Sequence, residues 1–455
     1  MIKNLTDIVG TDYVLTDPQK KLAYMYDEIE HIVRPKANED SVVVKPGNAD
    51  EISRILKYAN ARGIPVVVRG GGTGLCGAAI PVQKSIVIST ERLNRIIEID
   101  RDNMVAVMEA GVTLADLLEE LEKHDGLCFP VHPGDEGAQM GGMAVTNAGG
   151  ARAVRHGVMR KHIMGLEVVL ASGEKITLGG KLLKDNAGYN LMHLIIGSEG
   201  TLALVTKVIL RIYPEEKYSA TIIASFESMD DAAAACLDIL SGGTIPLAVE
   251  YQDRHLFEGT AEMMGKEWPL KKGDANLMII VSEAEEPMFY SACRRIHEIC
   301  QKHKSPEQYF AGRKSEQEEL LLIRSQHYEY IKHMIGHSFD MAVPVAEVPG
   351  FLRGLKTLAQ EYDTVTNITA HIADGNIHND IVLVNDEMPD YADELKNKMY
   401  ALCFSHGGTI TGEHGVGKLR REDLKLQKSK TELALMIGIK KLFDPNGIFN
   451  PETVV

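Results

Sequence analysis

The feature that most constrains this chain is a loop of nine residues with five glycines, Arg69-Gly70-Gly71-Gly72-Thr73-Gly74-Leu75-Cys76-Gly77. It follows the short apolar segment IPVVV, whose β-branched composition predicts a buried strand. Glycine has no side chain and tolerates positive φ, so the backbone N–H groups of such a loop can close around a pyrophosphate. The sequence therefore predicts a strand that ends in a loop suited to a dinucleotide.

Two well-known phosphate loops fit this segment poorly. Gly72, Gly74 and Gly77 match the GxGxxG spacing, but a Rossmann site needs a helix opening on the last glycine. Pro81 leaves room only for residues 78–80. A Walker loop needs Lys followed by Ser or Thr, and neither is present. A purely structural glycine loop is the alternative that this segment alone leaves open.

Two further tracts of small residues offer close backbone approach. They are GGMAVTNAGG at 141–150 and GSEGTL at 197–202. Three such loops around one ligand imply a large cofactor.

The chain before residue 214 combines helical and strand patterns. Asn48 or Asp50 caps a helix over EISRILKYANAR, and Thr113 caps another over LADLLEELEKH. Gly173 separates two strands of a predicted hairpin at 166–180. After a linker at 214–219, acidic helices alternate with strands, which predicts a second α+β domain.

Composition disfavours several functional classes. Lys and Arg number 49 against 64 Asp and Glu, and the net charge of -15 disfavours nucleic acid and anionic lipid as partners. The six cysteines include no CxxC pair, which argues against disulfide frameworks and iron-sulfur clusters. Asp7, Asp12 and Asp17 interrupt any export signal, and no apolar run approaches the roughly 20 residues of a membrane span. We expect a cytoplasmic protein.

Two histidines flank an Asp-Gly pair in AHIADGNIH. If Asp374 and Gly375 form a two-residue hairpin turn, His371 faces His378 directly on one side of the hairpin. Opposed β-carbons lie about 4.5 to 5.5 Å apart, a spacing suited to chelation of one ion. A pair of partly exposed sheet histidines is the alternative.

Glu413 and His414 lie between glycines in TGEHGVG. Two histidines and a carboxylate would leave coordination positions open for substrate. In an extended stretch these two side chains point in different directions, so one could bind metal while the other faces substrate. A turn with a surface charge pair is the alternative.

The glycine tracts carry a family resemblance. PVVVRGGGTGLCGAA, HPG, MGGMAVTNAGG and IIGSEGTLALVT resemble the FAD domain of the vanillyl-alcohol oxidase superfamily, in the branch of FAD-linked D-lactate, glycolate and D-2-hydroxyglutarate dehydrogenases. The match spans about residues 40 to 455 and implies an α+β protein with a FAD-binding domain and a substrate domain. Thr73 stands where some relatives attach flavin through histidine, so we expect noncovalent FAD. The residues implied to hold FAD are Arg69, Gly70, Gly71, Gly72, Thr73, Gly74, Leu75, Gly77, Pro133, Gly142, Asn147, Ala148, Gly150, Gly197, Glu199, Gly200 and Asn450.

The resemblance also predicts how the chain divides. The predicted parts are an N-terminal helical lead-in at 1–40, a FAD-binding domain at 41–215, a substrate and metal domain at 216–420 and a C-terminal return to the FAD domain at 421–455.

The AHxxDGNxH and GEHG motifs of the same family match here. They imply His371, His378 and Glu413 as ligands of a divalent metal (Zn, Fe or Mn) and His414 as the catalytic base. Asp380 departs from the asparagine that relatives often have beside the site.

Arg324, in LLLIRSQHYEY, matches the family's helix arginine, and an arginine fork is a natural partner for a substrate carboxylate. The tryptophan that often precedes it is absent, and a solvated helix arginine is the alternative. Asp340 and Pro344 match a DxxxP strand in which Ser338 replaces the lysine of some relatives. This replacement favours lactate over 2-hydroxyglutarate.

The sequence thus predicts an FAD- and metal-dependent dehydrogenase that oxidises a small D-2-hydroxy acid, D-lactate to pyruvate. Because it carries no cluster or haem motif, electrons are expected to leave to a separate partner. Among the acceptors that the resemblance implies, which are quinones, cytochromes, iron-sulfur subunits and an electron-transfer flavoprotein, the last is expected here. The alternatives are a glycolate or D-2-hydroxyglutarate dehydrogenase, a metal-free alcohol oxidase of the superfamily, a flavin electron-transfer subunit without a substrate site, and a metal-only hydrolase.

Overall fold

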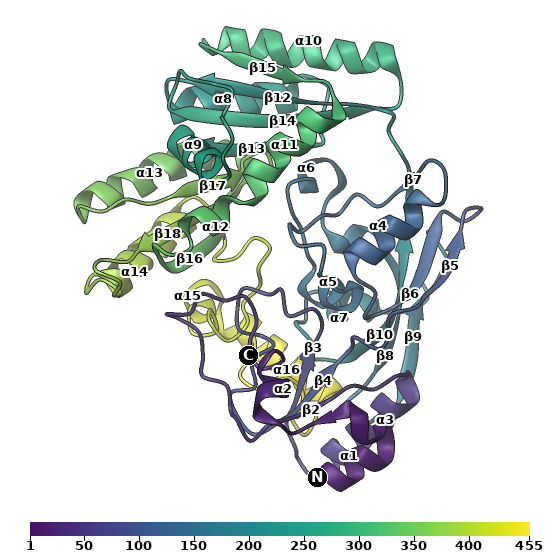
Figure 1. Ribbon diagram of the computed structural model, residues 1–455. Coiled ribbons are helices and arrows are strands. Elements are labelled where there is room, and N and C mark those ends of the chain that lie inside the picture. The colour runs from purple at the N-terminus through teal and green to yellow at the C-terminus, as the bar shows by residue number, and fades with distance from the viewer. The chain divides into compact units, whose positions relative to one another are not determined.

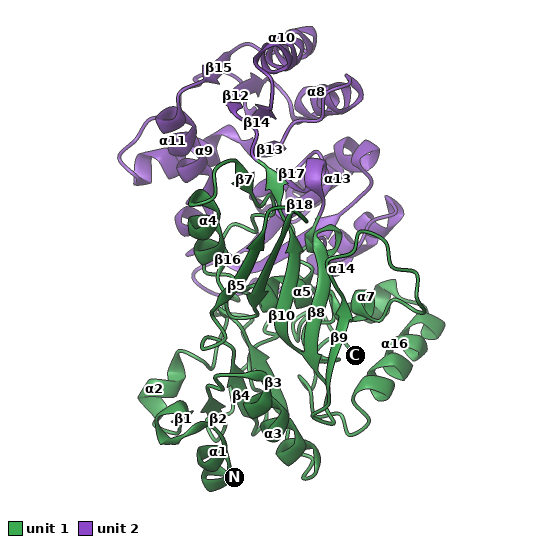
Figure 2. Cartoon of the chain, turned by 90° about the vertical axis from the view of Figure 1, so that its right-hand side faces the viewer, with its two compact units in different colours: residues 1–149, 158–214, 413–455 green, residues 150–157, 215–412 purple.

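The computed structural model describes residues 1–455 and divides into two compact units (Figure 2). Unit 1 consists of Met1–Gly149, Val158–Pro214 and Glu413–Val455. Unit 2 consists of Gly150–Gly157 and Glu215–Gly412. None of the helices combines the length and the apolar character needed to cross a membrane.

Unit 1 begins with a four-stranded sheet made of β1 (Val14–Leu15), β2 (Val42–Val44), β4 (Ile86–Ser89) and β3 (Val66–Arg69), in that order. β2, β4 and β3 are parallel, as expected where a crossover helix, α3 (Ala49–Asn60), joins β2 to β3. The Asn48 side chain caps α3 by accepting a hydrogen bond from the Glu51 N–H, so Asn48 is the cap and Asp50, the other predicted candidate, lies within the helix. The apolar face of α3 packs on this sheet around Ile52 and Leu56.

A five-stranded antiparallel sheet forms the other half of unit 1. Its order is β5 (Ile96–Asp100), β6 (Val105–Glu109), β10 (Leu204–Arg211), β8 (Ile163–Val169) and β9 (Lys175–Gly179). β8 and β9 form the predicted hairpin, and Gly173 has a φ of 80° in its turn. Thr113 and Asp116 form a capping box on α4 (Leu114–Glu122), which confirms the second predicted cap.

The remaining elements of unit 1 connect or cover these sheets. They are α1 (Ile2–Val9), α2 (Pro18–Leu22), α5 (Met140–Thr146), α7 (Met192–Ile195), α15 (Leu424–Gln427), α16 (Lys430–Phe443) and the pair β7 (Leu127–Cys128) and β11 (Tyr213–Pro214). The C-terminal segment returns to the first sheet, because the Asn450 N–H donates to the Val66 carbonyl at 2.8 Å.

Unit 2 is built on a seven-stranded antiparallel sheet (Figure 1). The order is β15 (Gln308–Ala311), β12 (Tyr218–Phe226), β14 (Ala275–Glu283), β13 (Ala248–Asp253), β17 (Ile368–His371), β18 (Asn376–Val382) and β16 (Ile335–Ala342). Its helices are α6 (Ala153–His156), α8 (Met229–Ser241), α9 (Arg254–Met263), α10 (Glu286–Lys302), α11 (Lys314–Ser325), α12 (His327–Ile331), α13 (Val348–Glu361) and α14 (Ala392–Ser405). β13 and β17 lie inside this sheet, and most of their side chains are buried.

The predicted register of the histidine hairpin is wrong. β17 and β18 pair His371 with Asn376 and Thr369 with His378, and the turn spans residues 372–375 rather than two residues. Because side chains alternate with a period of two, this two-residue shift leaves both histidines on one face of the sheet. They lie diagonally, with ring centroids 5.3 Å apart and planes at 88°.

Candidate functional site

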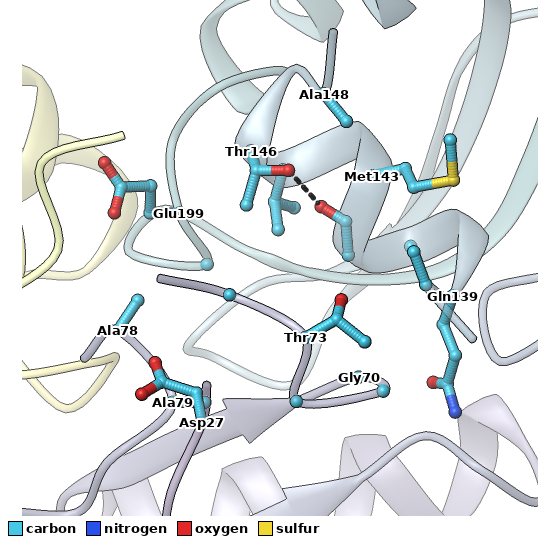
Figure 3. Close-up of a pocket in the computed structure, with 18 of the residues that line it drawn as sticks. Asp27, Gly70, Thr73, Ala78, Ala79, Gln139, Met143, Thr146, Ala148 and Glu199 are labelled. Carbon is cyan, nitrogen blue, oxygen red and sulfur yellow. Dashed lines mark hydrogen bonds between the residues drawn. The ribbon is translucent and has the colours of Figure 1, made fainter. Parts of the chain in front are cut away.

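Unit 1 contains a cavity of about 200 Å³ between the glycine loop, α5 and the 197–205 segment (Figure 3). Gly70 and Thr73 come from the loop after β3, Met143 and Thr146 from α5, and Glu199 from the third glycine tract. The three tracts singled out in the sequence therefore share one cavity.

At Gly71 and Gly72 the backbone of the glycine loop passes too close to other atoms for a side chain. A Cβ on Gly71 would lie 2.5 Å from the carbonyl oxygen of Gly137. Gly72 has a φ of 81°, and a Cβ there would collide with the guanidinium of Arg69. Arg69 is buried and donates to the backbone carbonyls of Tyr26 and Ala23 at 2.7 and 2.8 Å. Arg69 thus connects the start of the glycine loop to the backbone of residues 23 and 26.

Helix α5 exposes its backbone to the cavity at Gly142. A Cβ on Gly142 would meet no protein atom within 4 Å, although the residue lines the cavity. The Thr146 hydroxyl donates to the Gly142 carbonyl at 2.9 Å (Figure 3). The helix ends at Asn147, whose φ is 53° and whose side-chain oxygen accepts from the Arg160 N–H at 2.9 Å.

At the cavity wall, Glu199 and Asn450 form hydrogen bonds with segments of unit 1 that are far apart in the sequence. The buried Glu199 carboxylate accepts the N–H groups of Val416 and Gly417 at 2.8 and 2.7 Å. Burial raises the pKa of Glu199, against these stabilising backbone bonds. Asn450 accepts from the Val68 N–H at 2.9 Å and donates to the Glu199 carbonyl at 2.7 Å.

Glu413 and His414 line the same cavity. The chain bends here instead of running extended, and the prediction that their side chains diverge is wrong: His414 Nε2 lies 3.9 Å from Glu413 Oε1. The Cys76 thiol donates to the His414 carbonyl at 2.8 Å. A Cβ on Gly149 would lie 2.8 Å from Glu413 Oε2, so this glycine makes room for the carboxylate.

The residues implied to hold FAD fall into two groups. Those that line the cavity are Gly70, Gly71, Gly72, Thr73, Gly74, Leu75, Pro133, Gly142, Ala148, Glu199, Gly200 and Asn450. Those outside its lining are Arg69, Gly77, Asn147, Gly150 and Gly197, of which Gly150 belongs to unit 2.

Sequence reasoning missed several cavity residues. Asp27 is 6% exposed, and burial raises its pKa to about 6. Thr90 donates to the Gln139 side-chain oxygen at 2.6 Å, and both line the cavity. None of the three belongs to a glycine tract, so the sequence held no signal for them.

In unit 2, Glu250 on β13 joins His371 to Arg324. Glu250 Oε1 lies 2.6 Å from His371 Nδ1, and Oε2 accepts from Arg324 Nε and Nη2 at 3.0 and 2.7 Å. Burial opposes ionisation of Glu250, but His371 and Arg324 outweigh it and hold the pKa of this carboxyl below its usual range. Arg324 is therefore partly buried and held in an ion pair with the buried Glu250, and is not a solvated helix arginine.

His378 lies beside a second buried acid. Its Nδ1 is 3.7 Å from Asp340 Oδ1. Asp340 accepts hydrogen bonds from the Asn376 amide at 2.8 Å, the Thr411 hydroxyl at 2.6 Å and the Gly412 N–H at 3.0 Å. The aspartate of the DxxxP segment thus fixes the loop before Glu413.

The two departures from the family pattern are partners. Ser338 on β16 pairs with Asp380 on β18, and its hydroxyl donates to the Asp380 carboxyl. Burial raises the pKa of Asp380 to about 6, and the bond from Ser338 opposes this shift.

A further buried histidine, His327, was not predicted. Its Nδ1 accepts from the Gln252 amide at 2.9 Å. Burial lowers its pKa to about 3, and the charge of Arg324 adds to this effect, so His327 is neutral beside that guanidinium.

Comparison with known proteins agrees with this arrangement. A family model described as a FAD binding domain matches residues 41–179, and one described as the C-terminal domain of FAD linked oxidases matches 215–454. A D-lactate dehydrogenase of Archaeoglobus fulgidus is 38% identical over 433 residues, 95% of each protein. Glycolate oxidase subunit GlcD of Bacillus subtilis is 32% identical over 440 residues, 95% of this chain and 91% of that protein.

A solved structure of p-cresol methylhydroxylase with bound substrate superposes with a TM-score of 0.78. The two share 17% identity, and the match covers 100% of this chain and 96% of the other. The predicted fold class, α+β with a FAD-binding domain of the vanillyl-alcohol oxidase type, is confirmed.

The open space at Gly142 gives a prediction. In Gly142→Ala the added methyl points into the cavity, so we expect FAD affinity to fall about tenfold or more, as overpacking costs ~1–3 kcal/mol. The FAD-free protein should keep or gain stability, since alanine favours helix by about 0.5 to 1 kcal/mol. Fluorescence titration of FAD and thermal melts would measure both.

The matched control is Gly438→Ala in α16, where an added Cβ also meets nothing within 4 Å but lies outside the cavity lining. It should leave FAD affinity unchanged. Equal FAD affinity in the wild type and both variants would place the cofactor away from α5.

Proposed function

Since this chain belongs to the family of FAD-linked oxidases, we propose that it is a dehydrogenase of small D-2-hydroxy acids that oxidises D-lactate to pyruvate. The observation that carries the proposal is the Glu250 carboxylate, which holds His371 and Arg324 side by side on unit 2. One residue type binds metal and the other binds carboxylates, and a 2-hydroxy acid offers a hydroxyl and a carboxylate on adjacent carbons.

The cavity of unit 1 fits FAD. Its glycine loop excludes side chains at Gly71 and Gly72, and Gly142 leaves open space on α5. In this proposal the loop amides of residues 70–75 bind the pyrophosphate, while Glu199 and Asn450 keep the opposite wall closed. Bound FAD supplies the acceptor for the substrate's Cα hydride.

His371, His378 and Glu413 are the proposed ligands of a divalent metal, Zn, Fe or Mn. The fit rests on donor chemistry: with Nδ1 facing the Glu250 carboxylate, His371 carries its proton there and its lone pair on Nε2, the form in which imidazole binds metals. A divalent ion at this site would lower the pKa of the substrate hydroxyl.

The proposed roles of the remaining residues follow from their positions. His414, in the cavity wall, accepts the proton of the substrate hydroxyl. Arg324 binds the substrate carboxylate through Nη1, because Nε and Nη2 already bond Glu250. A carboxylate fixed in this way orients the Cα hydrogen and thereby sets the preference for one enantiomer.

An anaerobic reduction screen tests the proposed activity. The purified protein would be mixed with D-lactate, L-lactate, glycolate and D-2-hydroxyglutarate while flavin absorbance is followed. We expect D-lactate to bleach the flavin fastest and L-lactate to have no effect. A yellow protein that none of these acids reduces would refute the proposal and favour a subunit that only carries electrons.

The role of His414 gives a second test. His414→Asn should slow flavin reduction by D-lactate about 10² to 10⁴-fold, the usual range for loss of a general base. His193→Asn is the control, because His193 is exposed and outside the lining of this cavity. Stopped-flow absorbance measures both rates, and near-normal reduction in His414→Asn would move the base to another residue.

We also propose that the reduced flavin passes its electrons to an electron-transfer flavoprotein. The support is the sequence, which has no CxxC cluster motif and no haem attachment motif that could relay electrons within the chain. Enzyme reduced anaerobically with D-lactate should be reoxidised quickly by a purified electron-transfer flavoprotein and slowly by NAD. Fast reoxidation by NAD alone would contradict this partner.

A further inference from the structure

Glu250 is an acidic residue inside the sheet of unit 2. It lies on β13 between β14 and β17 and is 2% exposed. β13 pairs Tyr251 with Ala370, so the same register places Glu250 opposite His371. The backbone pairing of two strands therefore fixes the approach of this carboxylate to the imidazole.

The two oxygens of Glu250 have different partners. Oε1 meets His371 Nδ1 at 2.6 Å, while Oε2 accepts both Nε and Nη2 of Arg324. A carboxylate on one ring nitrogen of a histidine fixes the proton on that nitrogen, orients the ring and raises the basicity of the other nitrogen. Two bonds from one guanidinium edge to one oxygen likewise fix the plane of the arginine side chain.

We propose that Glu250 is a positioning residue that sets both His371 as a metal ligand and Arg324 as the anchor of the substrate carboxylate. This inference rests on the proposed function. Because a single carboxylate holds both side chains, it fixes the spacing between the metal-binding nitrogen and the guanidinium. That spacing selects acids whose hydroxyl and carboxylate are on adjacent carbons.

The sequence gives no motif for Glu250, which shares the segment IPLAVEYQD with a second acid, Asp253. A purely structural ion pair with Arg324 is the competing explanation. It predicts a loss of stability alone, whereas the positioning role predicts changes in metal affinity and substrate KM in folded protein.

The test variant is Glu250→Gln, which keeps the size of the side chain. Its amide oxygen can still accept from His371 Nδ1, but the amide NH₂ then faces the N–H groups of Arg324. The matched control is Glu283→Gln, which neutralises another mostly buried acid of unit 2 whose arginine partner is Arg155. FAD content and melting temperature identify any variant that fails to fold.

Zn²⁺ affinity, measured by competition with a chelator, is the first readout. We expect Glu250→Gln to bind Zn²⁺ about 10- to 100-fold more weakly than the wild type, the usual effect of losing an outer partner of a metal-binding histidine. Glu283→Gln should match the wild type. Unchanged Zn²⁺ affinity in a folded, FAD-replete Glu250→Gln protein would overturn the metal half of the proposal.

The second readout is KM for D-lactate at saturating metal. Glu250→Gln should raise KM for D-lactate. The double variant with Arg324→Gln should have the same KM as Arg324→Gln alone, since both substitutions disrupt the same carboxylate-binding guanidinium. Fully additive effects, or a KM equal to that of the wild type, would overturn the anchoring half.

Failure of the proposed function is distinguishable from failure of this inference. A wild-type protein that binds Zn²⁺ but oxidises none of the acids would refute the proposed function, and Zn²⁺ affinity of the Glu250 variant would then decide its role toward His371. A wild-type protein that D-lactate reduces but that binds no divalent ion would overturn the proposed metal site and the metal half of the inference, while the proposed oxidation of D-lactate would stand.

Discussion

Unit 1 depends on one buried carboxylate, that of Glu199. Removing a carboxylate from water is costly unless hydrogen bonds replace its hydration, and here two backbone N–H groups of residues 416 and 417 do so. The same residue receives the Asn450 amide at its carbonyl, and Asn450 in turn bonds β3. Four segments far apart in the chain are thereby joined at one wall of the cavity. The position of Glu413 and His414 follows, because they immediately precede the residues that Glu199 holds.

Local features of the fold could be predicted because their causes are local. A side-chain cap at Asn48, a capping box at Thr113 and a glycine turn at 173 each need only a few neighbouring residues. The prediction of the histidine hairpin was wrong at its turn. Asp374 accepts the Asn376 N–H, and a Cβ on Gly375 would collide with the Val343 carbonyl, so the turn uses four residues. The pairing with β16 and the close passage of residue 343 are tertiary constraints that an Asp-Gly pair does not reveal.

The cofactor cavity was more predictable than the groups around the histidines. A glycine tract is easy to recognise because its composition differs from that of ordinary segments. Its role can be inferred from one short stretch of sequence. Glu250 matches no motif and shares its strand with a second acid, Asp253, and its partners lie 74 and 121 residues away. Its importance arises only when strand register brings Glu250 and His371 together, so no spacing rule could find it. Asp340 was found only through the resemblance, and its three hydrogen-bond donors come from two distant segments.

The Ser338–Asp380 pair shows how two separate departures from a family pattern can have one cause. In sequence, a serine in place of a lysine and an aspartate in place of an asparagine are unrelated changes. In the sheet they are cross-strand neighbours joined by a hydrogen bond. A lysine ammonium at position 338 could bind a second substrate carboxylate, whereas a hydroxyl already committed to an acid cannot. The pair removes a cation and adds an acid two residues from His378, and on this ground lactate is proposed as substrate in preference to a dicarboxylic acid.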